Sequence, residues 1–391
     1  MSPAELVRLL RVCFRRALSR FDLAGRVRRA LDGVDASRVL AVGKAAPSML
    51  AGALRHHQEA LLVVPEGIAL GWVAPSTRVC FSDHPLPTER SVAAARAAHE
   101  LLARGGDVVA LVSGGTSALL AAPATGLSLD QKRAIVAELL AAGVPIREVN
   151  VVRRHLSSVK GGALARSGTG RVLTLIASDV LVGGAHDIGS GPTVADPSTV
   201  EDARAVLARL GLSAPLVETL KPTEPRARAL EHRVVARPDD FVAQVREELE
   251  AEGMTTFDLP PSDAGVESLS SAYVGLASSL NPGQALVRAA EPSVKVPSDA
   301  GRGGRSCHLA ALAAPRLPEG VALLCGASDG VDGASGGAGA VVTKDSFRGR
   351  DREAALKTFD TGRLHAAAGT MLESRGPSGL NLCDVHVLAR A

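Results

Sequence analysis

The sequence is poor in aromatic residues, with one tryptophan, one tyrosine and seven phenylalanines among 391 residues. Proteins that bind single-stranded nucleic acid stack bases on aromatic side chains, so this scarcity argues against such a partner. The formal net charge is only +3 and the arginines are spread along the chain, which argues against a duplex partner. No apolar run is long enough to span a bilayer. We therefore expect neither a nucleic-acid nor a membrane partner.

The cysteines lack any paired spacing. Cys13, Cys80, Cys307, Cys325 and Cys383 lie far apart, are odd in number and form no C-x-x-C motif. This usage favours free thiols in a reducing compartment over a disulfide framework or a zinc site. We therefore expect a cytoplasmic protein.

The N-terminal segment 3–31 is amphipathic and rich in arginine, and its apolar residues recur near helical spacing. It resembles an organelle transit peptide, but Glu5 and Asp22 interrupt the basic run. We predict a surface helix that packs on the first domain.

The chain is too long for one ordinary core and suggests two domains. Its composition, 46% hydrophobic with 40 glycines and 22 prolines, is typical of a folded, turn-rich protein. The stretch 213–238 is rich in proline, glutamate, arginine and alanine. We predict a boundary inside this stretch and divide the chain into domains 1–225 and 226–391.

A buried-type strand at 107–112 runs into the turn Ser113-Gly114-Gly115-Thr116-Ser117, and helical residues follow. Adjacent glycines let the backbone approach a ligand closely, and the three hydroxyls add donors. A helix that starts there would aim free N–H groups at an anion. The turn therefore predicts a phosphate or carboxylate site, and the alternative is an ordinary tight connection between strand and helix.

Three polar side chains, Lys44, Ser113 and Asp179, each follow directly on a predicted strand. The strands of this half alternate with helices, which indicates a doubly wound, Rossmann-like parallel sheet. In such sheets ligands bind beyond the carboxyl ends of the strands, so we expect these side chains to converge on one crevice. The predicted strands are 38–42, 61–64, 73–81, 107–112 and 172–177.

Lys44 and Asp179 are the candidates for catalysis. A lysine at a helix N-terminus is disfavoured by the helix dipole unless a phosphate lies between them, although an exposed lysine is the simpler reading. Asp179 could hold Mg²⁺ or accept a proton from an attacking hydroxyl, or could merely cap a turn. The glycine-rich stretch 183–193 is predicted to line a ligand site.

Further charged residues cluster at two places. Arg153, Arg154 and Lys160 could clamp a phosphate or carboxylate, or could form a solvated basic face. Asp329 and Asp332 resemble part of a calcium loop, but the spacing and final glutamate of an EF-hand are missing.

Taken together, these segments resemble the two-domain glycerate 2-kinase family with a C-terminal MOFRL domain, some of whose members are called hydroxypyruvate reductases. The resemblance covers most of the chain and rests on several ordered motifs. These are Gly43-Lys44-Ala45-Ala46, His84-Pro85, Ser113-Gly114-Gly115-x-Ser117-Ala118-Leu119, Asn150-x-Val152-Arg153-x-His155-Leu156-Ser157, Lys160-Gly161-Gly162, Ser178-Asp179-Val180 and Ser190-Gly191-Pro192-Thr193 with Asp196-Pro197.

The resemblance implies a Rossmann-like N-terminal domain, a smaller α/β MOFRL-like domain and a cleft between them. It also implies phosphorylation of the 2-hydroxyl of D-glycerate, or of a related hydroxy acid or specialised metabolite, with ATP and Mg²⁺. Lys44 would match the family's phosphate-contacting lysine, and Asp179 the acid beside the reacting hydroxyl, where it would also bind the metal. A homodimer is left open.

The remaining site residues fall into two groups. Phosphate or nucleotide binding is assigned to Ser113, Gly114, Gly115, Thr116, Ser117, Gly303, Gly304, Asp329 and Asp332. Substrate binding is assigned to His84, Arg153, Lys160, Arg305 and His308.

The chain departs from the family pattern at 303–308, where the family's Gly-Gly-Arg-Asn-Gln-Glu is Gly-Gly-Arg-Ser-Cys-His. His308 therefore replaces an acid. Two alternatives stay open: a lyase, cyclase or phosphate-transfer variant that uses His186 or His308, and an inactive homologue that only binds anions. An oxidoreductase is disfavoured because no G-x-G-x-x-G follows a strand with an acid downstream.

Overall fold

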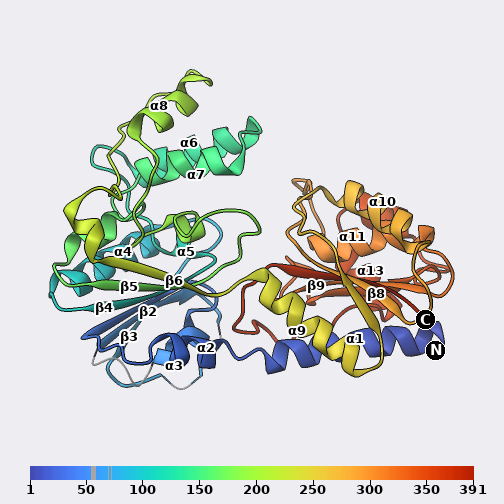
Figure 1. The fold of residues 1–391 in the computed structure, drawn as a ribbon. Coiled ribbons are helices and arrows are strands. Elements are labelled where there is room, and N and C mark those ends of the chain that lie inside the picture. Colours follow the sequence, from blue (N-terminus) through green and yellow to red (C-terminus); the bar gives the residue numbers. More distant parts are fainter. Residues whose placement is uncertain (54–58, 69, 72) are drawn as a thin grey trace. The chain divides into compact units, whose positions relative to one another are not determined.

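The computed structural model describes residues 1–53, 59–68, 70–71 and 73–391, and these form two compact α/β units (Figure 1). The first unit contains residues 22–236. The second combines residues 1–21 with residues 237–391. The predicted fold class, a parallel-sheet domain with a second α/β domain, is confirmed.

The sheet of the first unit is entirely parallel, with strand order β3-β2-β1-β4-β5-β6. Successive strands are added outward from β1 to β3 on one side of the sheet and from β4 to β6 on the other. The direction in which strands are added therefore reverses between the neighbours β1 and β4. Ligands of doubly wound sheets bind at this switch point, beyond the carboxyl ends of the two strands. The strands are β1 (Arg38–Val42), β2 (Glu59–Pro65), β3 (Thr77–Ser82), β4 (Val108–Ser113), β5 (Val172–Ala177) and β6 (Leu230–Ala236).

Helices cover both faces of this sheet (Figure 1). Helices α2 and α3 pack on one face, and α4 and α5 pack on the other. Beyond α5, helices α6, α7 and α8 share a small apolar core of their own. The helices are α2 (Leu23–Ala30), α3 (Ala46–Ala53), α4 (Glu89–Ala103), α5 (Thr116–Leu119), α6 (Leu129–Ala141), α7 (Ile146–His155) and α8 (Val200–Ala208), with short 3₁₀ turns at Ala163–Ser167, Ile188–Ser190 and Pro225–Ala229.

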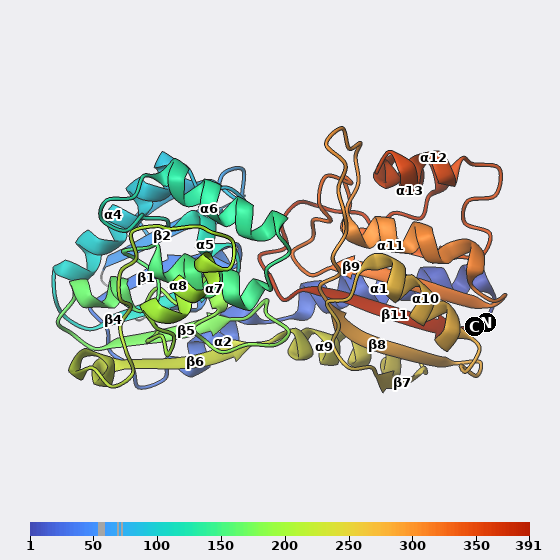
Figure 2. The same cartoon turned by 90° about the horizontal axis from the view of Figure 1, so that it is seen from above.

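The second unit has a mixed sheet with strand order β10-β9-β11-β8-β7. Only the pair β7 and β8 is parallel, and the other neighbours are antiparallel. Helices α1 and α9 lie on one face, while α10, α11 and α13 lie on the other (Figure 2). The elements are α1 (Pro3–Arg20), α9 (Pro238–Ala251), β7 (Thr255–Asp258), α10 (Val266–Ala277), β8 (Gln284–Ala290), α11 (Arg305–Ala313), a 3₁₀ turn (Ala314–Arg316), β9 (Val321–Ala327), β10 (Gly339–Thr343), α12 (Arg352–Lys357), α13 (Thr361–Ala368) and β11 (Asp384–Arg390).

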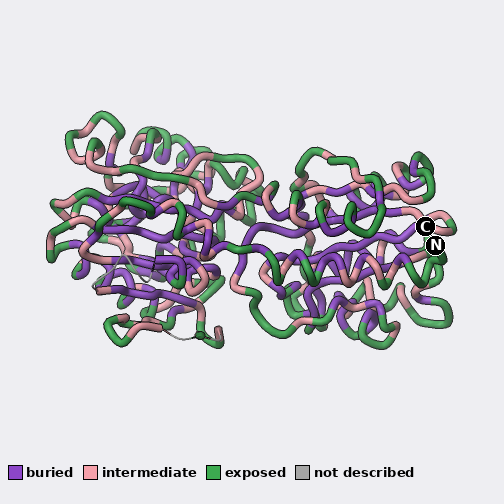
Figure 3. The backbone as a smooth tube through the Cα atoms, turned by 60° about the horizontal axis from the view of Figure 1, so that its bottom comes forward, coloured by how far each residue is buried: buried purple, intermediate pink, exposed green. Residues whose placement is uncertain are grey.

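The core of each unit lies between its sheet and its helices, and Figure 3 shows most strands of both sheets as buried, whereas the edge strands β3, β6 and β7 are largely exposed or half-buried. The apolar face of α1 belongs to the core of the second unit. Leu6, Leu10 and Phe14 are buried there, and the Phe14 ring meets Phe241 of α9 edge-on at 6.3 Å. The prediction of one surface helix packed on the first domain is therefore wrong for α1, whereas α2, the second helix of the segment, packs on α3 and β6 of the first unit. Helical periodicity identified the apolar face but not the sheet that covers it.

The division of the chain also differs from the predicted boundary after residue 225. Strand β6 (Leu230–Ala236) pairs in parallel with β5, so it completes the first sheet, and the division follows Ala236. The proline- and arginine-rich stretch thus contains a strand that its composition obscures. Among the described residues, no helix combines the length and apolar character needed to cross a membrane.

Candidate active site

A cavity of about 390 Å³ lies in the first unit, at the carboxyl ends of its strands. Its wall comes from the loops after β3, β4 and β5 and from helices α6 and α7. The lining residues are His84, Pro85, Leu86, Pro87, Gly114, Gly115, Ser117, Ala118, Ala121, Lys132, Arg133, Val136, Ala137, Leu140, Ile146, Asn150, Arg153, Lys160, Asp179, Asp187 and Gly189.

The turns that follow β1 and β4 are locked together at the switch point. The Lys44 N–H donates to the Gly114 carbonyl at 2.9 Å. Gly43 has φ +123°, and a Cβ there would lie 2.2 Å from the Ser113 hydroxyl oxygen. Only glycine fits this position, because both the backbone conformation and the space exclude a side chain.

The hydroxyls of Ser113 and Thr116 do not reach the cavity. Ser113 is fully buried, and its hydroxyl accepts a hydrogen bond from the Ala45 N–H at 3.1 Å. The Thr116 hydroxyl donates to the carbonyls of Val42 and Ser113. Both hydroxyls hold the glycine turn in shape, and their predicted contact with phosphate stays a prediction.

The helix after the glycine turn is much shorter than the sequence suggested. Helix α5 has four residues, and the N–H groups of Ala118 and Leu119 both turn back to the Gly115 carbonyl. Ser117 does line the cavity, with its hydroxyl 2.8 Å from that of Ser190. The turn therefore contributes glycine backbone and one hydroxyl, with little helix dipole behind them.

Lys44 and His84 meet at Gly115. A Cβ on Gly115 would lie 3.3 Å from Lys44 Cγ and 3.4 Å from His84 Cδ2. Asp179, half-buried at the end of β5, lines the same cavity. Three segments distant in sequence thus place a lysine, a histidine and an aspartate after strands of one sheet, and the predicted shared site of Lys44 and Asp179 stays a prediction.

Lys160 is buried and its ammonium group is already bound. Its Nζ donates to the carbonyl of Ser117 at 2.8 Å and to that of Leu120 at 3.4 Å. Burial lowers the pKa of Lys160 well below its usual value, and the positive charges of Lys132 and Arg153 lower it further. Lys160 therefore lines the cavity chiefly as the residue that fixes the C-terminal end of α5.

Sequence reasoning missed Lys132. It is 5% exposed in the first turn of α6, lines the cavity, and its Nζ has no hydrogen-bond partner among the described residues. Burial, and then Arg153, lower the pKa of Lys132 to about 7. One signal was present in the sequence: Ser128 and Gln131, whose spacing is that of a capping box, begin α6 and place Lys132 in its first turn, where the helix dipole disfavours a cation.

The two neighbouring arginines of α7, Arg153 and Arg154, have different contacts. Arg153 lines the cavity, where its guanidinium donates to the Asn150 side chain at 3.3 Å. Arg154 is buried and pairs with Asp187 at 3.1 Å and Asp196 at 3.0 Å. Arg153 therefore remains a candidate for ligand contact, and Arg154 holds the loop after β5 in place.

The glycine-rich stretch 183–193 supplies Asp187 and Gly189 to the cavity wall. The second oxygen of Asp187 accepts the Gly184 N–H at 3.0 Å, so both oxygens of this carboxylate are engaged. Within the part of the chain that the structure describes, no group of three or more metal-binding side chains occurs.

The candidate residues of the second unit form a buried polar network. Arg305 contacts Asp384 at 2.8 Å and also pairs with Glu291. Burial opposes its charge, but these two carboxylates raise the pKa of Arg305 above its usual value. The Arg305 guanidinium is thus held in place by two carboxylates.

Asp332 caps the N-terminus of α11. Its two oxygens accept the N–H groups of Ser306 at 3.0 Å and Cys307 at 2.8 Å. Burial, and then Asp384, raise the pKa of Asp332 to about 6. Asp332 thus caps a helix in this structure, and its predicted role in binding nucleotide or metal stays a prediction. Asp329 accepts the Val331 N–H at 3.0 Å in the adjacent turn.

Gly303, Gly304 and His308 have packing roles in the same unit. A Cβ on Gly303 would lie 2.4 Å from the Phe359 carbonyl oxygen, and one on Gly304 would lie 2.1 Å from that of Asp332. The His308 ring stacks on Phe359 at 5.0 Å, and its Nδ1 has no partner among the described residues. Burial lowers the pKa of His308, which favours the neutral ring.

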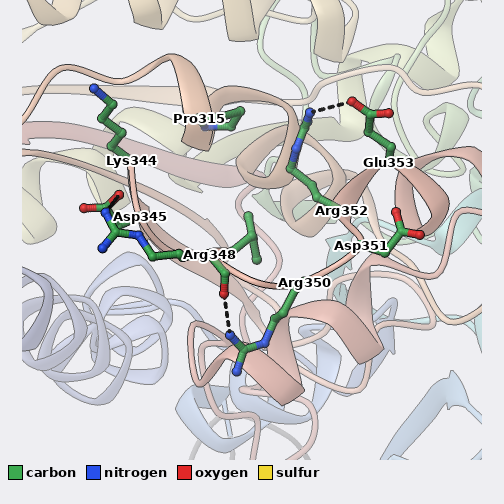
Figure 4. A pocket seen from close by; sticks show the side chains of 9 residues that line it. Pro315, Lys344, Asp345, Arg348, Arg350, Asp351, Arg352 and Glu353 are labelled. Carbon is green, nitrogen blue, oxygen red and sulfur yellow. Dashed lines mark hydrogen bonds and ion pairs between the residues drawn. The ribbon is translucent and has the colours of Figure 1, made fainter.

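A second cavity, of about 410 Å³, lies in the second unit beside α12 (Figure 4). Two of its arginines have acidic neighbours: Arg348 pairs with Asp345 at 2.8 Å, and Arg352 approaches Glu353 at 4.0 Å. All four side chains are on or near the surface. Because its charged groups are mostly exposed, this cavity offers less preorganised chemistry than the one at the strand ends.

Comparison with known proteins agrees with this architecture. The family described as Domain of unknown function (DUF4147) matches residues 9–222, and the MOFRL family matches residues 284–384. The glycerate 2-kinase of Pyrococcus horikoshii is 32% identical, covering 89% of this chain and 86% of that protein. The D-glycerate 2-kinase of Thermotoga maritima is also 32% identical, covering 92% and 93%.

The crystal structure of glycerate kinase from Thermotoga maritima matches with a TM-score of 0.86 and 27% identity, covering 99% of this chain and all of that one. An Agrobacterium vitis protein whose name proposes a hydroxypyruvate reductase is 34% identical, covering 81% of this chain and 79% of that protein. The family matches, the extent of the sequence identity and the structural similarity place this chain in the glycerate 2-kinase family, whose members are phosphotransferases with an alcohol group as acceptor.

Proposed function

We propose that this protein transfers a phosphoryl group from ATP to a hydroxyl of D-glycerate or of a closely related hydroxy acid. The observation that supports the proposal is the cavity at the strand ends, which His84, Gly115 and Asp179 line, with Lys44 Cγ 3.3 Å from where a Cβ on Gly115 would lie. A site of this kind suits phosphoryl transfer, which depends mainly on positioning and charge neutralisation. The relatives named as glycerate kinases support the same reaction.

Lys44 is proposed to hold the transferred phosphoryl group. Its backbone is fixed by the hydrogen bond to Gly114, and its side chain runs along the glycine at position 115, where no Cβ keeps a ligand away. The cation lies just before α3, so a phosphate there would be attracted by both the ammonium group and the N-terminus of the helix.

Asp179 is proposed to orient the acceptor hydroxyl and accept its proton, and it is the candidate ligand for Mg²⁺. Magnesium in kinases is held by one or two carboxylates together with substrate phosphates, and the donor set of this cavity fits that pattern. Asp187 is less available because Arg154 and Gly184 already occupy its oxygens. When bound, Mg²⁺ would neutralise charge on the phosphates.

The assignment is tested by measuring ADP release from Mg·ATP with D-glycerate and a panel of small hydroxy acids. Lys44→Ala is expected to lower turnover by at least about a hundredfold, because it removes a charge that acts on the transferred group. Lys357→Ala, which changes an exposed lysine on α12, is the matched control and should keep full activity.

Two results would contradict the proposal. If the folded protein releases no ADP with any acceptor, the kinase assignment fails, and lyase or cyclase chemistry or simple anion binding must be examined. If instead the protein oxidises NADH with hydroxypyruvate, the reductase name of the Agrobacterium vitis relative applies. A reducing compartment such as the cytoplasm is the proposed location, since all five cysteines are free.

A further inference from the structure

Two buried lysines line the cavity, and their surroundings differ. The Lys160 ammonium group donates to the carbonyls of Ser117 and Leu120. Lys132 has a buried ammonium nitrogen with no hydrogen-bond partner among the described residues. A neighbouring cation, Arg153, also lines the cavity and donates a long hydrogen bond to Asn150, at 3.3 Å.

A buried cation without a partner is unfavourable, because desolvation is not offset by any acceptor. A second cation beside it increases the cost. Proteins keep such groups where a ligand supplies the missing negative charge. The Lys132 amine therefore has a donor capacity that the folded chain leaves unused, and the cavity is the space into which that donor can act.

We propose that Lys132 and Arg153 form an oxyanion subsite that binds the carboxylate of the acceptor. The ligand is identified from the proposed function, on which this inference rests. The inference adds which part of the cavity holds the carboxylate. Lys44 and Asp179 then act on the hydroxyl and the phosphoryl group at the strand ends. A carboxylate and a phosphate are both compact oxyanions, so phosphate is the competing ligand for this subsite.

The groups around Lys132 make the subsite net positive. Helix α7 contributes Arg153, and the turn after it contributes Lys160. The loop after β5 contributes two carboxylates, of which Asp187 is engaged by Arg154. In the described part of the chain, the titratable and charged side chains that line the cavity with Lys132 are His84, Arg133, Arg153, Lys160, Asp179 and Asp187.

An apolar rim limits what else the subsite can accept. Leu86, Leu140 and Ile146 line the same cavity and are 69%, 48% and 54% exposed. A ligand held at Lys132 would therefore carry its charge inward and leave uncharged atoms toward this rim. A small hydroxy acid has this distribution, whereas inorganic phosphate is polar on every side.

The test is calorimetric titration of the full-length protein, without ATP, with D-glycerate, glycolate, L-lactate and inorganic phosphate as separate probes. Lys132→Met keeps the length and packing of the side chain but removes the donor. It is expected to weaken carboxylate binding by about tenfold or more, as expected for loss of a hydrogen bond to a charged group. Lys132→Arg should recover part of the affinity, and Lys357→Met should leave it unchanged.

A second readout separates binding from a structural role. At pH 8 the Lys132 amine is mostly neutral, so an oxyanion that binds beside it should draw a proton from the buffer. Titrations in Tris and HEPES should show this uptake for the wild type but not for Lys132→Met. A lysine that only supports the fold would show no such difference.

Three outcomes would overturn the subsite. The first is wild-type protein that binds none of the three hydroxy acids, and the second is Lys132→Met protein that binds them with unchanged affinity and proton uptake. The third is selective loss of phosphate binding, which would assign the subsite to a phosphoryl group. Failure of the kinase proposal looks different, because hydroxy acids would bind in a Lys132-dependent manner without any release of ADP.

Discussion

The backbone N–H of Lys44 donates to the carbonyl of Gly114 at 2.9 Å, which ties the turn after β1 to the turn after β4. These two strands flank the point where the strand order of the sheet reverses. The bond thus fixes the backbone of a candidate catalytic residue against a glycine that lines the cavity. Because this hydrogen bond joins two backbone groups, replacing either side chain would not remove it. The geometry of the two turns is therefore tested by substitutions at neighbouring positions.

Gly115→Ala should lower both activity and stability. Gly115 has φ +86°, and an added Cβ would approach Lys44 Cγ at 3.3 Å and His84 Cδ2 at 3.4 Å. The positive φ alone costs about 1–2 kcal/mol for an alanine. Gly211→Ala is the matched control because Gly211 also has positive φ but open space around it. Urea unfolding should show a similar loss of unfolding free energy in both variants, and only Gly115→Ala should lose activity. Equal activities would show that the added Cβ does not disturb Lys44 or His84.

Lys132→Met should stabilise the ligand-free protein, on the order of 2 kcal/mol at pH 7, because it removes a buried cation without a partner. The folded pKa is about 7 and the ordinary value is 10.5. The penalty is therefore fully present below pH 7, where both states are protonated, and disappears as the pH rises toward 10.5.

Urea unfolding of both proteins at pH 6.5, 8 and 9.5 measures this difference. The advantage of the variant should shrink with each step, while Lys357→Met stays within about 0.5 kcal/mol of the wild type throughout. A destabilised Lys132→Met protein would show that Lys132 supports the fold.

Asp332→Ala should destabilise the protein by about 1–3 kcal/mol. Its carboxylate accepts the N–H groups of Ser306 and Cys307, and these donors would remain buried without a partner. Asp332→Asn should cost less because one acceptor oxygen remains. Asp345→Ala, which breaks an exposed ion pair in the same unit, should change the unfolding free energy by less than about 0.5 kcal/mol. Equal losses in Asp332→Ala and Asp345→Ala would contradict the capping role.

His386 and His365 should make the protein sensitive to moderate acid. Burial lowers the pKa of each to about 4, from an ordinary value of 6.5. As the pH falls, these histidines are protonated near pH 6.5 in the unfolded chain but only near pH 4 in the folded protein. The unfolding free energy is therefore unaffected above pH 6.5 and falls as the pH decreases toward 4.

Denaturant titrations at pH 7, 5.5 and 4.5 test this dependence. His386→Gln should show a shallower loss of stability than the wild type, because one titrating group is removed. His232→Gln changes an exposed histidine and should keep the wild-type slope. Identical slopes in all three proteins would show that burial of His386 does not govern its protonation.

Local patterns in the sequence determined much of the first sheet. The apolar runs ending before Lys44, Ser113 and Asp179 are strands, and all three lie at the carboxyl end of one parallel sheet. The spacing of Ser128 and Gln131 is that of a capping box, and a helix begins there. These features could be read directly because strand and helix periodicity, turns and caps depend on neighbours within a few residues.

Tertiary structure alone decided how the same residues are used. It buried the hydroxyls of Ser113 and Thr116, turned Arg153 and Arg154 toward different partners, and enclosed Lys132. It also placed the N-terminal helix in the second unit and brought Asp332 to the start of α11. Side-chain periodicity specifies which face of an element is apolar or polar, whereas the group that meets that face is set by packing between segments far apart in the chain.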